Sequence, residues 1–71
     1  LCSYLYTNSM DKAHIGSEKL ESGCVAVNTG VVAIAEAPFG GIKQTGYGRE
    51  GGSGAIKDYL NVKYTHMGLK I

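Results

Sequence analysis

The feature that most constrains this chain is a glycine-rich stretch that runs from Pro38 to Gly52 and reads PFGGIKQTGYGREGG. Seven of the eleven glycines lie between Gly40 and Gly54. Glycine adopts positive φ without a steric penalty, so such a run indicates a backbone path that other residues resist. A loop of more than about 20 residues without regular structure is uncommon in a compact domain, and such loops are usually functional or disordered. The stretch therefore predicts a shaped loop rather than a helix or a strand.

Size and charge limit what the chain can do alone. Seventy-one residues make at most one small domain. A chain of this size buries only about 60% of its unfolded surface, so its core is marginal. The formal net charge of +1 implies no strongly charged partner, and we expect neither nucleic acid nor a membrane. No apolar run reaches the roughly 20 residues of a spanning helix, and no signal peptide is evident.

The two cysteines, Cys2 and Cys24, match neither a disulfide framework nor a zinc pattern. A single disulfide between Cys2 and Cys24 is possible. We expect a cytoplasmic protein, however, and cytosolic thiols are usually free. Cys24 lies within an apolar strand, where a thiol is usually inert, so we expect a small core residue rather than a nucleophile.

The first third of the chain predicts one βαβ unit. Ser3–Thr7 is rich in aromatic and β-favouring residues and reads as a strand. Asn8 is a candidate N-cap for a helix over residues 9–22, and Gly23 suits a left-handed C-cap. Cys24–Val27 is apolar without alternation, as in a strand covered on both faces. This order predicts a parallel pair of strands with a right-handed crossover.

The rest of the chain predicts less regular structure. Residues 29–52 show no sustained period, yet they include the apolar run Val31–Ala35, which needs cover that so short a chain cannot supply. The chain also begins at Leu1 without an initiator Met, so we expect a segment of a larger protein. A short helix is predicted over residues 49–59 and a strand over residues 61–67. That strand either pairs with another chain by β-augmentation or forms an edge of its own sheet.

Three motifs have both a functional and a structural explanation. Residues 46–51 match GxGxxG, but no hydrophobic strand precedes them, so a tight turn is favoured over dinucleotide binding. Lys43 and Arg49 flank glycines and can bind an anion, although a lone basic pair is more often solvated or ion-paired. Phe39 is either a plug in a core or a side chain that projects into a cavity.

The order of these features is similar to the C-terminal end of the aldehyde dehydrogenase superfamily, over essentially the whole chain. The family signature reads Pro-Phe-Gly-Gly, any residue, Lys, any residue, Ser or Thr, Gly, any residue, Gly-Arg-Glu, and residues 38–50 match it. Asn28–Gly30, Ala37–Gln44 and Arg49–Gly51 further resemble the succinate-semialdehyde dehydrogenases. We therefore expect an α/β fragment of the aldehyde dehydrogenase fold, with a βαβ unit, a long Gly-rich loop, a short helix and a C-terminal edge strand.

The resemblance implies an oxidoreductase that converts an aldehyde to a carboxylic acid with NAD or NADP. In the family a cysteine thiolate attacks the aldehyde, hydride passes to the nicotinamide, and a glutamate-activated water hydrolyses the resulting thioester. These groups, the oxyanion-hole asparagine and the cofactor-binding fold lie upstream of the region resembled. We therefore expect no catalytic, cofactor-binding or metal-binding residue in this segment, and Asn28 is similar to a structural asparagine of the family.

The resemblance also divides the chain. Residues 1–60 are expected to be the C-terminal part of the catalytic domain, with a substrate-entrance loop over residues 29–48. Residues 61–71 are expected to form the oligomerisation strand. The implied partners are other aldehyde dehydrogenase subunits or the missing N-terminal portion, with a homo-oligomer formed through residues 61–67.

Three residues of the entrance loop are candidates for substrate binding. Phe39 is similar to an aromatic wall of the aldehyde pocket in the family. Ala33 and Ile34 stand where succinate-semialdehyde enzymes often carry a serine that helps to hold the substrate carboxylate. Either a less polar aldehyde or carboxylate binding by upstream arginines is compatible with this departure.

Three functions therefore remain open. The leading prediction is a C-terminal fragment of an NAD(P)-dependent aldehyde dehydrogenase that is inactive alone. The second is a truncated paralogue that binds full-length subunits through its terminal strand. The third is a small anion-binding domain that uses residues 40–54.

Overall fold

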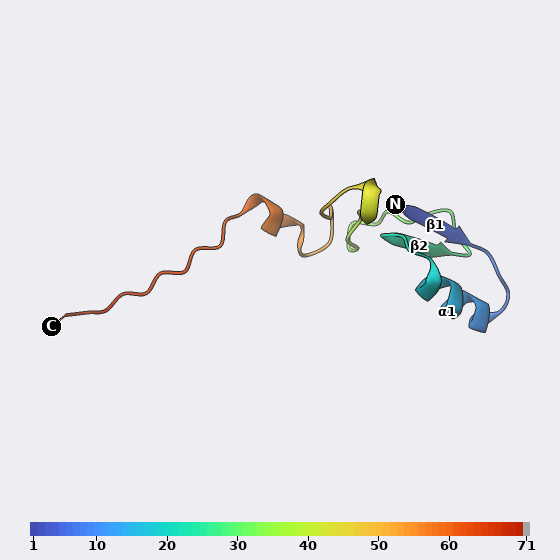
Figure 1. Cartoon of the computed structure of the whole chain (residues 1–71), viewed down its shortest axis with the longest axis horizontal. Helices are drawn as coiled ribbons and strands as arrows, with labels where there is room; N and C mark the ends of the chain where they lie inside the picture. Colours follow the sequence, from blue (N-terminus) through green and yellow to red (C-terminus); the bar gives the residue numbers. More distant parts are fainter. Residues whose placement is uncertain (71) are drawn as a thin grey trace.

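The computed structural model describes residues 1–70, and its regular elements gather in the first part of the chain (Figure 1). Strand β1 (Cys2–Leu5) leads into helix α1 (Met10–Lys19) and then into strand β2 (Cys24–Val27). The two strands are parallel and pair in register from the first residue of each to the last. Helix α1 contacts both strands and connects them, so the predicted βαβ unit is present.

Side-chain capping fixes the start of α1. The Ser9 hydroxyl accepts a hydrogen bond from the backbone N–H of Lys12 at 3.3 Å, and the Thr7 hydroxyl accepts one from the backbone N–H of Ser9 at 3.1 Å. Ser9 has the extended backbone of an N-cap, so the prediction of Asn8 was wrong by one residue. The helix is also shorter than predicted and ends at Lys19.

Gly23 does not end α1, contrary to the prediction. Leu20 is the C-cap, in extended conformation, and its N–H donates to the Gly16 carbonyl oxygen at 3.0 Å. The reason for a glycine at position 23 is its contact with Gly40, because a Cβ there would overlap the Gly40 carbonyl oxygen. The missing side chain lets the glycine-rich loop lie directly against the start of β2.

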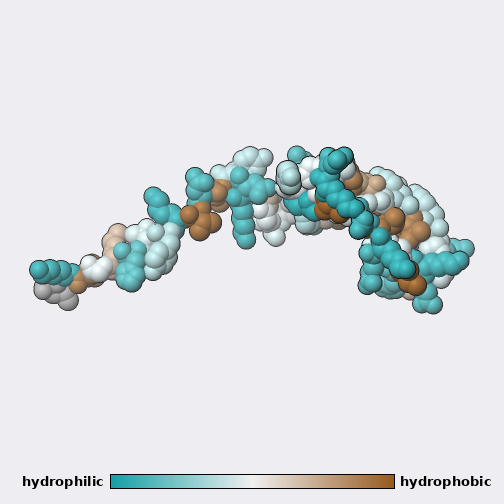
Figure 2. All heavy atoms as spheres, viewed as in Figure 1, coloured by the Kyte–Doolittle hydropathy of each residue, from teal (hydrophilic) through white to brown (hydrophobic). Residues whose placement is uncertain are grey.

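The βαβ unit contains little core. Among residues 1–70, Ala26 is the single buried apolar side chain, with 5% of its surface exposed. Val31 and Ile34, in the apolar run predicted to need cover, are 67% and 57% exposed. Figure 2 shows apolar residues at the surface in both halves of the molecule. Exposed apolar surface of this kind is typical of a region that other protein covers.

The glycine-rich segment is organised by one antiparallel bridge, between Phe39 and Glu50. A 3₁₀ turn, η1 (Lys43–Thr45), lies inside the bridge. Four glycines beyond it have positive φ, from 68° to 114°: Gly46, Gly48, Gly51 and Gly52.

The helix predicted over residues 49–59 is a shorter 3₁₀ helix, η2 (Ala55–Tyr59). Gly51 and Gly52 explain the difference, because their positive φ angles do not fit a right-handed helix. The helical spacing in the sequence therefore predicted the element but not its start or its type.

Residues 60–70 form an extended, exposed tail, and the strand predicted over residues 61–67 does not form within residues 1–70 (Figure 1). The tail stretches the molecule to 69 Å, and the Cα radius of gyration is 18.6 Å. A compact domain of this length has a radius of gyration of about 11 Å. Ile71, the last residue of the predicted oligomerisation segment, lies outside the described residues. Residues 1–70 include no helix with the length and apolarity needed to cross a bilayer.

Candidate functional site

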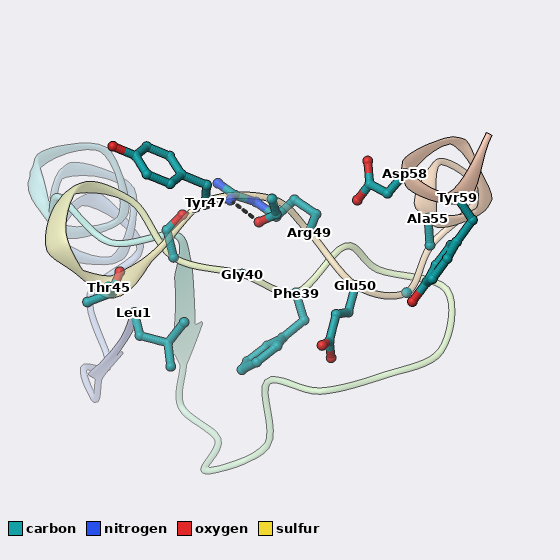
Figure 3. A pocket seen from close by; sticks show the side chains of 13 residues that line it. Leu1, Phe39, Gly40, Thr45, Tyr47, Arg49, Glu50, Ala55, Asp58 and Tyr59 are labelled. Carbon is teal, nitrogen blue, oxygen red and sulfur yellow. Dashed lines mark hydrogen bonds between the residues drawn. The ribbon is translucent and has the colours of Figure 1, made fainter. Parts of the chain in front are cut away.

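An open hollow of about 530 Å³ lies beside the glycine-rich loop (Figure 3). Phe39 and Leu1 supply apolar surface to it, and Tyr59 adds an aromatic ring from η2. Arg49 and Asp58 contribute charged groups. The hollow therefore combines an apolar wall with polar groups, as ligand sites do.

Two backbone hydrogen bonds to Glu50 fix the main chain of Phe39 at this hollow. Its N–H donates to the Glu50 carbonyl oxygen at 2.7 Å, and the Glu50 N–H donates to the Phe39 carbonyl oxygen at 2.7 Å. Such reciprocal bonds define a hydrogen-bonded antiparallel pair. The pair fixes the point from which the half-buried Phe39 side chain leaves the main chain.

Arg49 closes the loop between these two residues. Its Nη1 atom donates to the carbonyl oxygens of Gly41 at 2.7 Å and Gly48 at 2.8 Å. Hydrogen bonds from a charged donor are roughly twice as strong as those between neutral groups. Arg49 therefore joins the two sides of the loop that carries Phe39.

Three contacts anchor the loop to the βαβ unit. The Cys24 thiol donates to the Gly40 carbonyl oxygen, with a sulfur-to-oxygen distance of 3.7 Å. The Lys43 ammonium pairs with the Glu21 carboxylate at 2.5 Å, with both side chains exposed. Exposed ion pairs contribute only about 0–1 kcal/mol. The close approach of Gly23 to the Gly40 carbonyl is therefore the more specific anchor.

The predicted substrate residues do not share one place in the structure. Phe39 lines the hollow, whereas Ala33 and Ile34 are exposed on the apolar run and do not line it. Leu1 and Asp58 were not predicted as neighbours of Phe39. Residues this far apart in the sequence carry no local signal of contact, so only the fold reveals them.

The two candidate anion-binding cations already have partners within the chain. Lys43 is paired with Glu21, and Arg49 donates to loop carbonyl groups. An anion at this loop would have to compete with both sets of contacts.

The GxGxxG motif at residues 46–51 does not form the turn that cradles a dinucleotide. A 3₁₀ turn precedes it in place of a strand, and Glu50 within it pairs with Phe39. These residues therefore do not fit a nicotinamide dinucleotide. Residues 1–70 also contain no group of three His, Cys, Asp or Glu side chains arranged to hold a metal ion.

Cys2 and Cys24 are free thiols at the starts of the two strands, and both are half-buried. Desolvation raises the pKa of the Cys2 thiol, and the neighbouring Cys24 thiol raises that pKa further. The Cys24 thiol donates the hydrogen bond to the Gly40 carbonyl oxygen that helps to anchor the glycine-rich loop.

Comparison with known proteins gives one family. Residues 1–65 match the aldehyde dehydrogenase family. The chain is 48% identical over 68 residues to a succinate semialdehyde dehydrogenase of Acinetobacter baylyi. This alignment covers 96% of the chain and 14% of that relative. Identity is also 48% over 68 residues to a 3-sulfolactaldehyde dehydrogenase of Pseudomonas putida, with 96% and 14% covered.

A third relative is the Escherichia coli succinate-semialdehyde dehydrogenase (NADP⁺), which is 45% identical over 69 residues, or 97% of the chain and 14% of the relative. No solved structure matches the chain significantly. The chain thus spans about 14% of the length of these curated relatives. Because the family match covers residues 1–65, the resemblance in the glycine-rich signature is confirmed, and this chain belongs to the aldehyde dehydrogenase family.

Proposed function

We propose that this chain is the C-terminal segment of an NAD(P)-dependent aldehyde dehydrogenase whose substrate carries an anionic group, with succinate semialdehyde as the leading candidate. The match of residues 1–65 to the family carries this proposal. Relatives named for succinate semialdehyde and for 3-sulfolactaldehyde are equally similar to the chain. One compound ends in a carboxylate and the other in a sulfonate, so an aldehyde with an anionic end is the chemistry they share.

In the whole enzyme, an aldehyde, water and NAD(P)⁺ give a carboxylic acid, NAD(P)H and a proton. The cofactor supplies the hydride acceptor when it is bound. Residues 46–51 do not fit that cofactor. We assign no reacting group to this segment, because the reacting groups of the family lie upstream of the region that it resembles. Its proposed contribution is an apolar wall that excludes water and orients the aldehyde.

We assign that wall to the entrance loop, residues 29–48. Phe39 supports the assignment because it is half-buried at an open hollow and its main chain is fixed by the bridge to Glu50. Ala33 and Ile34 are exposed on the same loop and offer no hydrogen-bond donor from their side chains. In this proposal the anionic end of the substrate is therefore bound by arginines elsewhere in the enzyme.

A chimera tests the proposal, with residues 1–70 of this chain in place of the matching segment of the Escherichia coli enzyme. We expect the chimera to oxidise succinate semialdehyde with NADP⁺. A soluble, folded chimera without this activity would refute the proposal.

The role of Phe39 is tested in the same chimera. Phe39→Ala is expected to raise KM by roughly tenfold or more, as for a lost apolar contact in a pocket, while Phe39→Leu retains most of the affinity. Met10→Ala, in the exposed part of α1, is the control and leaves both constants unchanged. Wild-type KM and kcat in Phe39→Ala would remove Phe39 from the substrate wall.

We further propose that residues 61–67 add to the sheet of a neighbouring subunit. Their backbone forms no strand within residues 1–70, and their side chains are exposed. Deletion of residues 61–71 from the chimera is expected to lower its sedimentation coefficient to that of a smaller assembly. Lys63→Ala, which keeps the backbone, serves as the control. An unchanged coefficient after the deletion would contradict this assignment.

The same exposed tail favours a second candidate, a truncated paralogue that binds full-length subunits. We expect the isolated 71-residue chain to show no turnover with NAD(P)⁺ and semialdehyde. Analytical ultracentrifugation of the chain mixed with a full-length relative separates the two candidates. A monomeric chain with no affinity for that relative would remove the second candidate, and turnover by the isolated chain would disprove its inertness.

A further inference from the structure

Cys2 and Cys24 occupy matching positions that the proposed function does not use. They are the first residues of β1 and β2 and are direct register partners in the parallel pair. Neighbouring strands lie about 4.8 Å apart, and disulfides usually join Cα atoms roughly 4.4–6.8 Å apart. Register partners also project from the same face of a sheet. The strand pairing therefore brings the two thiols within the range of a disulfide.

The side chains support this geometry. Both thiols are free and half-buried. Burial raises the pKa of the Cys2 thiol, and the neighbouring Cys24 thiol raises that pKa further. Cys24 also donates to the Gly40 carbonyl oxygen at 3.7 Å. The pair thus lies where the strands meet the loop that carries Phe39.

We propose that Cys2 and Cys24 form a reversible dithiol–disulfide site that is oxidised by peroxides. One thiolate attacks a peroxide oxygen, the O–O bond breaks, and a sulfenic acid forms with release of water. The second thiol attacks the sulfenic sulfur, the S–S bond forms, and the S–O bond breaks to release a second water. Two thiols are oxidised to one disulfide while one hydrogen peroxide is reduced to two waters.

Oxidation of this site changes the loop anchor as well as the strands. The disulfide has no S–H proton, so the Gly40 carbonyl oxygen loses the hydrogen bond that Cys24 donates in the reduced chain. Gly40 directly follows Phe39, whose main chain is bonded to Glu50. Oxidation of the two thiols therefore changes the hydrogen bonding at the start of the glycine-rich loop. Neither the site nor this coupling depends on the proposed aldehyde substrate.

The test compares the full chain with a swap variant of identical composition, Cys2→Ser together with Ser3→Cys. The swap moves one thiol to the opposite face of β1, because successive strand residues alternate between faces. Both chains are treated with hydrogen peroxide, alkylated with iodoacetamide and weighed by intact mass spectrometry. In buffer we expect the wild type to form the intramolecular disulfide at least about tenfold faster, since its thiols are pre-positioned. In urea the two rates converge, because the loops differ by a single residue.

Equal rates in buffer, disulfides only between chains, or separately alkylated thiols would each overturn the proposal. The wild type alone provides a second comparison that does not depend on the folding of the variant: its disulfide must form faster in buffer than in urea. Dithiothreitol must restore both thiols.

Amide chemical shifts test the coupling to the loop. Oxidation of the wild type is expected to shift the amide resonances of Gly40 and Gly41, while Cys24→Ser shows no such change with peroxide. Unchanged resonances at both glycines in the oxidised chain would overturn the coupling.

Discussion

The βαβ unit and the tail share β-favouring residues but have different structures. Cys24–Val27 and residues 61–67 both include β-favouring side chains, yet only the former is a strand. In β2 the backbone groups pair with β1, whereas the tail pairs with nothing in residues 1–70 (Figure 1). Strand propensity reflects the fit of a side chain into an existing sheet more than a preference of the backbone itself. Partners, rather than composition, therefore separate the two regions.

The largest effect is expected at the contact between Gly23 and Gly40, which joins the βαβ unit to the glycine-rich loop. Gly23→Ala places a Cβ on the Gly40 carbonyl oxygen and should destabilise the docked loop by roughly 1–3 kcal/mol, the usual cost of overpacking. Hydrogen exchange at the Phe39 and Glu50 amides measures the loss. Gly54→Ala is the matched control, because nothing lies within 4 Å of the added methyl group. Equal protection in both variants would show that the loop does not depend on this contact.

A smaller effect is expected at the start of α1. Ser9→Ala removes the acceptor for the Lys12 N–H and should cost about 1 kcal/mol. Asn8→Ala, one residue earlier, should change the stability much less. Circular dichroism during urea unfolding compares the two variants. A larger loss in Asn8→Ala would return the N-cap to the residue that the sequence suggested.

The third prediction concerns pH and the start of β1. The pKa of Cys2 is raised above its ordinary value of 9.0 by burial and by Cys24, while the Leu1 amino group acts in the opposite direction. The folded chain therefore favours the protonated thiol, and this stabilisation is complete below the ordinary pKa and lost as pH rises through the folded pKa. Under reducing conditions the wild type should lose stability relative to Cys2→Ser as the pH rises above about 9, the ordinary pKa of the thiol. A difference between the two that does not vary with pH would contradict this.

The smallest effect is expected in the tail itself. Deletion of residues 61–71 removes no strand pairing seen within residues 1–70, so the free energy of unfolding of the βαβ unit should change by less than about 0.5 kcal/mol. Thermal unfolding of the deleted and complete chains measures this difference. A marked loss of stability would mean that the tail supports the unit, and the contrast between the regions would fail.

The elements predicted from the sequence were those determined by local pattern. Cys24–Val27 has the predicted bounds because a continuous apolar run flanked by glycine and asparagine signals a strand, although only Ala26 of its four residues is buried. The N-cap was one residue off because Asn8 and Ser9 both suit that position, and the Thr7 hydroxyl bonded to the Ser9 N–H distinguishes them. Gly23 was misread because its reason is a contact with Gly40, which no local pattern reveals.

The candidate site was predictable only in part, for the same reason. Phe39 became a candidate for the pocket through the family resemblance, because the residues alone left both a core plug and a side chain in a cavity open. The bridge to Glu50 and the nearness of Asp58 depend on positive φ angles at Gly46, Gly48, Gly51 and Gly52, whose combined path the sequence does not specify. The strand over residues 61–67 was predicted from its residues and from the family resemblance, but no strand within residues 1–70 pairs with it.

The reciprocal hydrogen bonds between Phe39 and Glu50 use main-chain atoms alone. The carboxylate at position 50 is therefore not needed to hold the aromatic ring in place, and neither are the side chains at Ala33 and Ile34. A protein with this arrangement can exchange the side chains around the ring without disturbing the main-chain hydrogen bonds that position it.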